Sequence, residues 1–405
     1  MNVRRSAAVL AATTVIGAAA PAVAAPPSPS PSVAIPSGLY GSADPTYDGV
    51  WRQSLALLAQ HTVEVKPAAK AVDWLAGQQC ASGAFAAFRA DAAKPCDPKV
   101  VVDTNSTAAA AQALAALGGH ATAVDKAVTW LKSAQNTDGG WGFTPGGPSD
   151  TNSTSVAVGA LVAAGEKPAE VTKGGKSPYD LLAKWSIPCG AGDGGALAYQ
   201  PDKKGKLAAN ADATAAGVLA GVGKGFVTTA GQAPKDSRAC ADSDRQLTPS
   251  QVAANGASYL AEATQGGFLK SVLPGAEDQP DYGNTADAVV SLAAQGSTAA
   301  ARKPYAWLEK HATAWAKQSG PAAYAQLVLA AHTLGTDPRD FGGTDLVKQL
   351  NTTGPAPAKS DDAAEQAAEK DGEKGFGVWW TVGVLFVAGI GIGFLLSGRN
   401  RGRQP

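Results

Sequence analysis

One short motif occurs twice in this chain, followed each time by the same kind of helix start. Residues 135–143 read Gln-Asn-Thr-Asp-Gly-Gly-Trp-Gly-Phe, and Asp-Thr-Asn-Ser-Thr follows at residues 150–154, ahead of an apolar stretch. An earlier copy at residues 79–85 precedes the same five-residue string at residues 103–107. A repeat of about 50 residues is one structural unit used several times, so the sequence predicts a closed or stacked array of helix pairs.

Two kinds of helix alternate along the chain. Mixed polar and apolar segments suit an outer ring with one solvated face. They are predicted at residues 67–79, 124–135, 178–185, 250–264 and 303–318, with a short one near 345–350. Segments that are apolar on nearly every side and rich in alanine and glycine are expected to be buried and closely packed. They are predicted at residues 47–60, 106–117, 154–164, 211–221, 285–295 and 322–334.

Such helices are expected to close as a double ring, with the N-terminal ends of the inner helices converging on one mouth. Pockets lie where elements converge, so polar residues at these ends are the candidate ligand-binding residues. They are Asp103, Asn105, Asp150, Asn152, Asn210, Asp212, Tyr282, Asn284 and Asp287. The alternative is N-capping, in which a side-chain oxygen accepts a hydrogen bond from a free helix N–H and contributes about 1 kcal/mol. Collectively, several such ends form a site for a polar or anionic group.

The string Gln-x-x-x-Gly-x-Trp at residues 135–141 resembles the repeat motif of the terpenoid cyclase and protein prenyltransferase superfamily, the prenyltransferase/squalene oxidase repeat. Residues 79–85 are a variant that ends in phenylalanine, and the copies near Gly194 and Gly267 are degenerate. The resemblance covers residues 38–352. It implies an all-α fold, an α/α toroid of about six helix hairpins, in which the motif ties adjacent repeats together.

The enzyme signatures of that superfamily are incomplete in this sequence. Residues 242–245, Asp-Ser-Asp-Arg, lack the final carboxylate of the Asp-x-Asp-Asp acid motif. Residues 361–365 imitate an aspartate-rich magnesium and diphosphate box, but they lie in an acidic stretch that is expected to be solvated. Neither an Asp-x-Cys zinc motif nor a Gly-Cys-Gly-Glu-Gln thioester string occurs. We therefore expect no catalytic residue, no cofactor and no metal.

The remaining resemblance is to the cobalamin carriers of the transcobalamin and intrinsic-factor type, which are exported toroids without catalysis. It implies a ligand-binding role, in which the mouth grips a large amphipathic molecule such as a corrinoid or a similar nutrient. Those carriers close a small β domain over the ligand, and this chain has none, so either a second surface or transport protein supplies it or binding is open and weaker. The alternatives are an extracytoplasmic enzyme acting on an isoprenoid or lipid, and a structural cell-envelope module.

The two ends of the chain predict export and a membrane anchor. Residues 1–24 have the charged start, apolar core and Ala-Val-Ala cleavage site of a signal peptide. A Pro/Ser-rich linker (25–37) leads to the ectodomain (38–352), and an acidic Pro/Ala tether (353–376) follows it. Residues 377–397 are predicted to form one transmembrane helix, with a basic cytoplasmic tail at 398–405. The ectodomain is then extracellular on a single-pass bacterial surface protein.

Cysteine content and charge narrow the functional classes further. In an exported chain the four cysteines are expected to form the pairs Cys80–Cys96 and Cys189–Cys240, with free thiols as the alternative. No Cys-x-x-Cys spacing occurs and the four histidines are scattered, so zinc is not expected. The net charge of zero, without a basic block, argues against nucleic acid as a partner.

Overall fold

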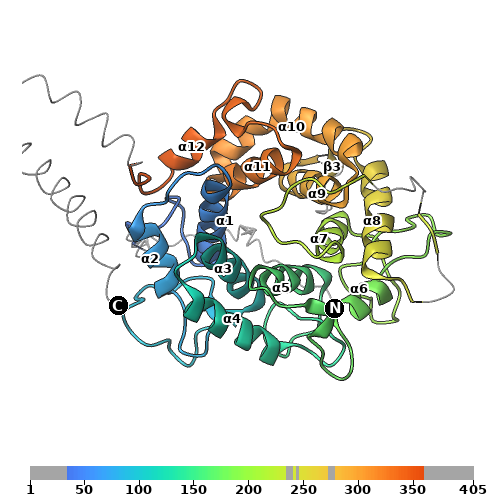
Figure 1. Ribbon diagram of the computed structural model, residues 1–405, viewed down its shortest axis with the longest axis horizontal. Helices are drawn as coiled ribbons and strands as arrows, with labels where there is room; N and C mark the ends of the chain where they lie inside the picture. The colour runs from blue at the N-terminus through green and yellow to red at the C-terminus, as the bar shows by residue number, and fades with distance from the viewer. Residues whose placement is uncertain (1–33, 234–239, 243–245, 272–278, 360–405) are drawn as a thin grey trace, which may run out of the picture. The chain divides into compact units, whose positions relative to one another are not determined.

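The fold is known from a computed structural model that describes residues 34–233, 240–242, 246–271 and 279–359. These residues form twelve α-helices, which alternate between an inner and an outer ring (Figure 1). The inner helices are α1 (Gly49–Thr62), α3 (Thr104–Leu117), α5 (Thr151–Ala163), α7 (Ala211–Gly221), α9 (Tyr282–Gln295) and α11 (Pro321–Leu334). The outer helices are α2 (Ala69–Gly77), α4 (Ala121–Ala134), α6 (Pro178–Lys184), α8 (Pro249–Ala263), α10 (Thr298–Ser319) and α12 (Leu346–Thr352).

The inner ring is closed. Each inner helix packs against the next one in sequence, and α11 returns to pack against α1. Small side chains allow this approach, since Ala108, Ala109, Ala110 and Ala111 on α3 are all fully buried. Every predicted helix overlaps an observed one, so the all-α toroid expected from the helix pattern is confirmed for this part of the chain.

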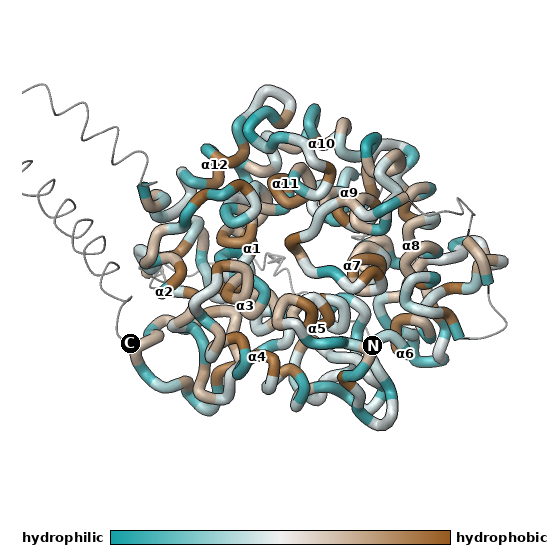
Figure 2. The backbone as a smooth tube through the Cα atoms, in the orientation of Figure 1, coloured by the Kyte–Doolittle hydropathy of each residue, from teal (hydrophilic) through white to brown (hydrophobic). Residues whose placement is uncertain are grey.

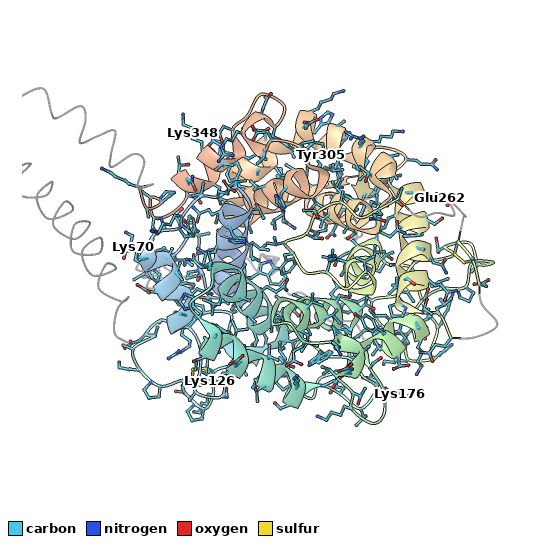
Figure 3. The ribbon with its side chains drawn as sticks, in the orientation of Figure 1. Lys70, Lys126, Lys176, Glu262, Tyr305 and Lys348 are labelled. Carbon is cyan, nitrogen blue, oxygen red and sulfur yellow. A yellow bond between two sulfur atoms is a disulfide. The ribbon has the colours of Figure 1, made fainter. Side chains whose placement is uncertain are left out.

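The outer helices are amphipathic. On α4 the buried residues are Val124, Ala127, Val128 and Leu131, a spacing of three or four residues that forms one apolar stripe. Figure 2 shows the same division, with hydrophilic segments on the periphery and hydrophobic segments on the inner helices. In Figure 3 the labelled lysines lie at the outer edge of the ring. The outer ring therefore covers the apolar inner ring and carries the solvated surface.

The repeated motif is a clasp between neighbouring repeats, as its resemblance implied. The Gln135 side-chain amide donates to the carbonyl oxygens of Gly139 (2.8 Å) and Val171 (3.1 Å). The fully buried indole of Trp141 donates to the Leu131 carbonyl at 2.7 Å. Gly139 has φ +90°, and a Cβ there would lie 2.2 Å from the Ser177 carbonyl oxygen, so only glycine fits.

A threonine in four of the inner helices completes the clasp. Its hydroxyl accepts a hydrogen bond from a backbone N–H in the loop that carries the motif. The pairs are Thr107 with Phe85 (2.9 Å), Thr154 with Trp141 (3.0 Å), Thr214 with Leu197 (2.9 Å) and Thr285 with Leu269 (3.0 Å). The copies that are degenerate in sequence thus keep the same geometry. In the fourth copy the structural equivalent of Trp141 is Leu269.

Two short antiparallel sheets, which the helix pattern did not predict, hold the motif loops against the inner helices. Strand β1 (Phe85–Ala86) pairs with β2 (Val102–Asp103), and Phe85 lies opposite Asp103. Strand β3 (Leu269–Lys270) pairs with β4 (Pro280–Asp281), and Leu269 lies opposite Asp281. Each sheet therefore delivers the chain to the first residue of an inner helix, α3 or α9.

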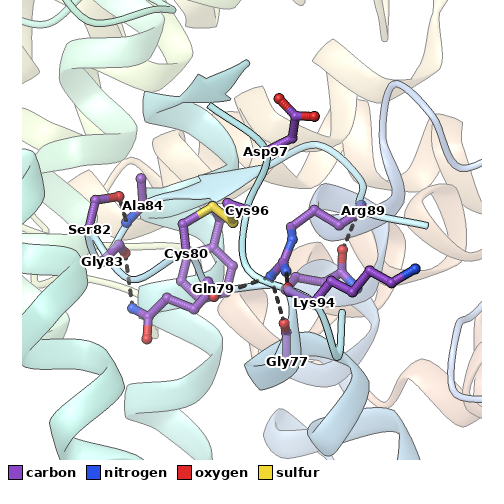
Figure 4. Close-up of a disulfide and its surroundings, with 12 residues drawn as sticks. Gly77, Gln79, Cys80, Ser82, Gly83, Ala84, Arg89, Lys94, Cys96 and Asp97 are labelled. Carbon is purple, nitrogen blue, oxygen red and sulfur yellow. Dashed lines mark hydrogen bonds between the residues drawn. A yellow bond between two sulfur atoms is a disulfide. The ribbon is translucent and has the colours of Figure 1, made fainter. Parts of the chain in front are cut away.

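Both predicted disulfides are confirmed. Cys80 is bonded to Cys96 and Cys189 to Cys240, and the described residues contain no free cysteine. Figure 4 shows the first disulfide beside the side chain of Arg89, which donates to the carbonyl oxygens of Gly77, Gln79 and Lys94. This guanidinium organises the loop that the disulfide closes.

The predicted export and anchor segments lie outside the described residues. These are the signal peptide (1–24), the transmembrane helix (377–397), the tail (398–405) and most of the linker and tether. Among the residues that are described, no helix combines the length and apolar character needed to span a membrane. The start of the tether contacts the toroid, because the Ala358 N–H donates to the Lys66 carbonyl and the Tyr40 hydroxyl donates to that of Pro355.

Candidate functional site

A cavity of about 330 Å³ lies inside the inner ring, and all six inner helices contribute to it. We call it the central cavity. The inner helices supply Trp51, Leu55, Asn105, Gln112, Asn152, Ser155, Val156, Gly159, Asp212, Ala215, Ala216, Leu219, Asn284, Asp287, Val290, Ser291, Gln326 and Leu329. The loop after α7 supplies Lys224, Gly225 and Phe226. The volume falls at the lower end of the range of about 300–1,000 Å³ for small-molecule sites.

Five of the nine candidate residues line this cavity. They are Asn105, Asn152, Asp212, Asn284 and Asp287. The first three each occupy the second residue of an inner helix, just inside its N-terminal end. We call these helix ends the mouth. The structure brings the five side chains together.

Three of the remaining four candidates are helix caps. Asp103, Asp150 and Asn210 accept hydrogen bonds from the backbone N–H groups of Ser106 (2.6 Å), Ser153 (2.7 Å) and Ala213 (2.8 Å). Each capping residue lies two positions before a cavity residue. The capping side chain bonds to an N–H group of its own helix, whereas the cavity residue faces the ring centre. For these three residues the structure shows the N-capping role.

Tyr282, the fourth candidate outside the cavity, belongs to an aromatic row beside the mouth. Its ring lies 5.2 Å from that of Trp307 and 5.5 Å from that of Trp315, between centroids. Phe268 continues the row at 4.7 Å from Trp307. Rings at these separations gain contact energy from one another, so Tyr282 packs α9 against α10.

Two carboxylates in the cavity are held by amides. The Asn152 amide on α5 donates to Asp212 on α7 at 2.6 Å. The Gln326 amide on α11 donates to both oxygens of Asp287 on α9, at 3.3 and 3.2 Å. These bonds cross between inner helices, so the carboxylates are fixed relative to the ring.

The surroundings raise the pKa of both carboxyls. Burial raises the pKa of Asp287 to about 7, with a further contribution from the charges of Asp212 and Asp281, against the opposing hydrogen bond from Gln326. Burial also raises the pKa of Asp212, and the charge of Asp281 adds to this. At neutral pH the cavity therefore holds a carboxyl that is poised between its two protonation states.

Three polar atoms of the cavity have no hydrogen-bond partner in the described part of the protein. They are Asn105 Oδ1, Asn152 Oδ1 and Ser155 Oγ, and all three are buried. Ser155 as a whole is only 6% exposed. A buried acceptor without a partner costs about 1–3 kcal/mol, so three such atoms in one cavity indicate a surface shaped for hydrogen-bond donors.

The lower part of the cavity combines apolar Val156, Leu219 and Phe226 with the polar Gln112 and Ser291. It is closed by residues 222–233, which we call the crossing loop. In Figure 1 this loop leaves α7 and reaches across the ring towards α1. The Phe226 ring meets Trp51 edge-to-face at 5.5 Å, and the Phe226 N–H donates to Gln112 Oε1 at 2.9 Å. The N–H of Gly231 donates to the Ala293 carbonyl at 2.9 Å. These contacts hold the loop in place as the floor.

Four polar residues of the inner helices that line the cavity escaped prediction: three stand alone in an apolar helix, and Ser155 ends the polar run at residues 150–155. They are Gln112, Ser155, Ser291 and Gln326. Spacing is the signal that could have found three of them. Gln112 follows Asn105 by seven residues, Ser155 follows Asn152 by three and Ser291 follows Asn284 by seven, and each spacing places both members on one helix face. Gln326 has no such partner on α11.

Of the two strings that imitate enzyme motifs, the structure describes Asp242 alone. Asp242 accepts a hydrogen bond from the Cys189 N–H at 2.8 Å and so supports the second disulfide. The rest of that string, residues 243–245, lies outside the described residues, as does the acidic string at 361–365. In the described part of the chain no group of three or more His, Cys, Asp or Glu residues is placed to hold a metal ion.

Comparison with known families agrees with this geometry. The model of the prenyltransferase alpha-alpha toroid domain matches residues 45–194, which contain α1 to α6. Over these residues the match supports the toroid of the terpenoid cyclase and prenyltransferase superfamily. A search of curated proteins found no match to this chain. The match covers the first three hairpins of the toroid, and α7 to α12 repeat their architecture with weaker motifs.

Proposed function

We propose that this protein is a membrane-anchored surface protein whose toroid binds a ligand in the central cavity without changing it chemically. The observation that carries the proposal is the set of buried acceptors without partners, Asn105 Oδ1, Asn152 Oδ1 and Ser155 Oγ. A ligand that donates hydrogen bonds to them would satisfy acceptors that no described protein group reaches.

The division of the cavity supports an amphipathic ligand. Asn105, Asn152 and Asp212 lie in the first turn of their helices, whereas Val156 and Leu219 line the cavity further along. Seven residues separate Asp212 from Leu219, which is about 10 Å along a helix axis. A polar group at the mouth and an apolar group against the floor satisfy both regions at once.

Apolar side chains near the mouth support a ligand or partner larger than the cavity. Tyr47, next to the start of α1, is 90% exposed. Phe143 and Tyr199 are also exposed, and their carbonyl oxygens accept hydrogen bonds from the N–H groups of Thr104 and Thr151 at the starts of α3 and α5. These side chains offer contact area beside the polar mouth.

A corrinoid or a similar nutrient is the candidate that the carrier resemblance supplies. Its macrocycle exceeds a cavity of 330 Å³, so it would rest over the mouth and send one amide-bearing arm inside. The N–H groups of such an arm match the acceptors of Asn105 and Asn152. A second surface or transport protein that closes over the mouth, as expected from the resemblance, would complete the site.

The proposed location rests on the ends of the chain and on its cysteines. The predicted signal peptide and transmembrane helix would place the toroid outside the membrane. The two disulfides support this placement, because disulfides persist in oxidising compartments.

A thermal-shift panel on the purified full-length protein tests the proposal. Corrinoids, isoprenoids and cell-wall fragments are added, and a ligand at about 100 times its dissociation constant should add roughly 2.7 kcal/mol. The matched variants are Ser155→Ala in the cavity and Ser133→Ala on the exposed face of α4. Ser155→Ala should weaken binding by about five-fold, the value of one hydrogen bond, and Ser133→Ala should leave it unchanged. Equal affinity in both variants would place the ligand elsewhere.

One observation favours a second candidate, an enzyme acting on an isoprenoid or lipid. The Asp287 carboxyl, with its pKa raised to about 7, is suited to general acid–base catalysis near neutral pH. Incubation of an isoprenoid with the wild type and with Asp287→Asn, followed by product analysis, separates the candidates. Product that disappears in the variant would establish catalysis and overturn the binding proposal.

A further inference from the structure

The charges of the central cavity are unbalanced. Within the described residues, neither Asp212 nor Asp287 forms an ion pair with a lysine, arginine or histidine, and the nearest charged neighbours that act on them are other aspartates. Lys224 lines the cavity, but it belongs to the crossing loop at the far end and is itself exposed. The mouth thus concentrates negative charge without a resident counter-charge.

Three amide donors near the mouth already have partners. Asn152 donates to Asp212, Gln326 donates to Asp287, and Asn284 donates to Asp281 at 2.8 Å. What the mouth still offers is acceptors: the free carbonyl oxygens of Asn105 and Asn152, with Ser155 Oγ just below them. A group that brings hydrogen-bond donors therefore complements these oxygens and the two carboxylates.

We propose that the group which enters the mouth of the cavity is a protonated amine attached to an apolar body. This inference rests on the proposed ligand-binding function and names the chemistry that the site selects. An ammonium has three N–H donors and no acceptor, so it matches the Asp212 carboxylate and the free carbonyl oxygen of the neighbouring Asn152. Its positive charge balances the carboxylates in surroundings that screen charge less than water does. The apolar body then meets Val156, Leu219 and Phe226.

The raised pKa values agree with this geometry. The groups that act on Asp287 are Asp212, Asp281 and the Gln326 amide, and none of them is a cation. An ammonium would restore the ionised form of the carboxyl, so amine binding below pH 7 should release a proton. Affinity for an amine should rise between pH 5.5 and pH 8, whereas affinity for a neutral ligand should stay level.

Three probes of matched shape test the proposal: cyclohexylamine, cyclohexanol and cyclohexanecarboxylate. Binding to the full-length protein is measured by titration calorimetry at pH 8, where the amine is protonated. We expect the amine to bind at least about ten-fold more tightly than the alcohol, as a charge-assisted hydrogen bond exceeds a neutral one. The carboxylate should bind most weakly of the three.

The double variant Asp212→Asn and Asp287→Asn should abolish the preference for the amine. These substitutions keep the side-chain shape, and a thermal melt verifies that the variant folds. Asp125→Asn, on the exposed face of α4, is the matched control and should keep the preference. An alcohol that binds as tightly as the amine, or a carboxylate that binds more tightly, would overturn the inference.

A corrinoid in the same series separates this inference from the proposed function. If a corrinoid binds the wild type and the double variant equally while the amine does not bind, the ligand-binding function stands and the amine inference falls. If neither the corrinoid nor any of the three probes binds, both fall. If the amine binds and its preference depends on the two aspartates, both are supported.

Discussion

The two halves of the toroid share one architecture and differ in what they place in the cavity. The first half, α1 to α6, coincides with the family match at residues 45–194 and carries the complete motifs. It contributes amides to the mouth, Asn105 and Asn152. The second half, α7 to α12, has degenerate motifs and contributes the carboxyls of Asp212 and Asp287 beside the amides of Asn284 and Gln326. The toroid thus tolerates a change of motif, and both of these carboxyls come from the second half.

This difference separates residues that maintain the fold from residues that define the site. Thr154 in the first half and Thr285 in the second accept the same backbone hydrogen bond, although the loops they hold carry Trp141 and Leu269 respectively. The clasp needs a hydroxyl at one position and an apolar side chain at the other. The cavity residues are free of that requirement, so their chemistry varies from repeat to repeat.

The largest expected effect comes from removing the apolar side chain of the clasp in each half. Trp141→Ala should lower the free energy of unfolding by about 5 kcal/mol, since it removes a fully buried ring and its bond to the Leu131 carbonyl. Leu269→Ala, in the equivalent place, should cost about 3 kcal/mol. Urea unfolding measures both. If Leu269→Ala cost less than 1 kcal/mol, the two clasps would not be equivalent.

The disulfides offer the next comparison, because one lies within the first half and the other joins the halves. Cys80 and Cys96 are 16 residues apart, and Cys189 and Cys240 are 51 apart. The chain-entropy estimate gives about 3 kcal/mol for the first and about 4 kcal/mol for the second. Paired serine variants, unfolded in urea, should follow this order. A larger loss from the shorter loop would show that local contacts such as those of Arg89 dominate.

The sequence predicted the fold better than the site. Local composition distinguishes inner from outer helices, so the alternation of the two rings could be predicted. The caps Asp103 and Asp150 could be predicted because each precedes an apolar run. The crossing loop could not be predicted. Phe226 bonds to Gln112, which is 114 residues away, and no local pattern encodes a contact of that kind. Gln326 was missed for the same reason, since its meaning depends on Asp287 across the ring.

The second-half carboxyl should make stability depend on pH. Because the folded pKa of Asp287 is about 7 and its ordinary value is 3.8, the native state holds the proton more tightly than the unfolded state. Its contribution to stability is therefore complete below pH 3.8 and is lost as pH rises through 7. Asp287→Asn should raise the free energy of unfolding at pH 8 by about 1–2 kcal/mol relative to the wild type, with a smaller gain at pH 5.

Unfolding at pH 5, 6, 7 and 8 checks this expectation. Asp125→Asn, an exposed carboxyl of the first half, serves as the control and should give parallel curves for variant and wild type. A gain in Asp287→Asn that does not change with pH would mean that the folded carboxyl does not titrate between pH 5 and pH 8, which would contradict a pKa of about 7.

The smallest expected change in stability distinguishes a capping residue from a cavity residue of the first half. Asp150→Ala removes the hydrogen bond to the Ser153 N–H and should cost about 1 kcal/mol of stability. Asn105→Ala should raise the stability by up to about 1 kcal/mol, because it removes a buried carbonyl oxygen that has no partner among the described residues. The ligand panel should give the opposite ranking, with binding weakened by Asn105→Ala alone. If Asn105→Ala destabilises the protein as much as Asp150→Ala does, Asn105 maintains the fold. The amides of the first half would then no longer be candidate ligand-binding groups.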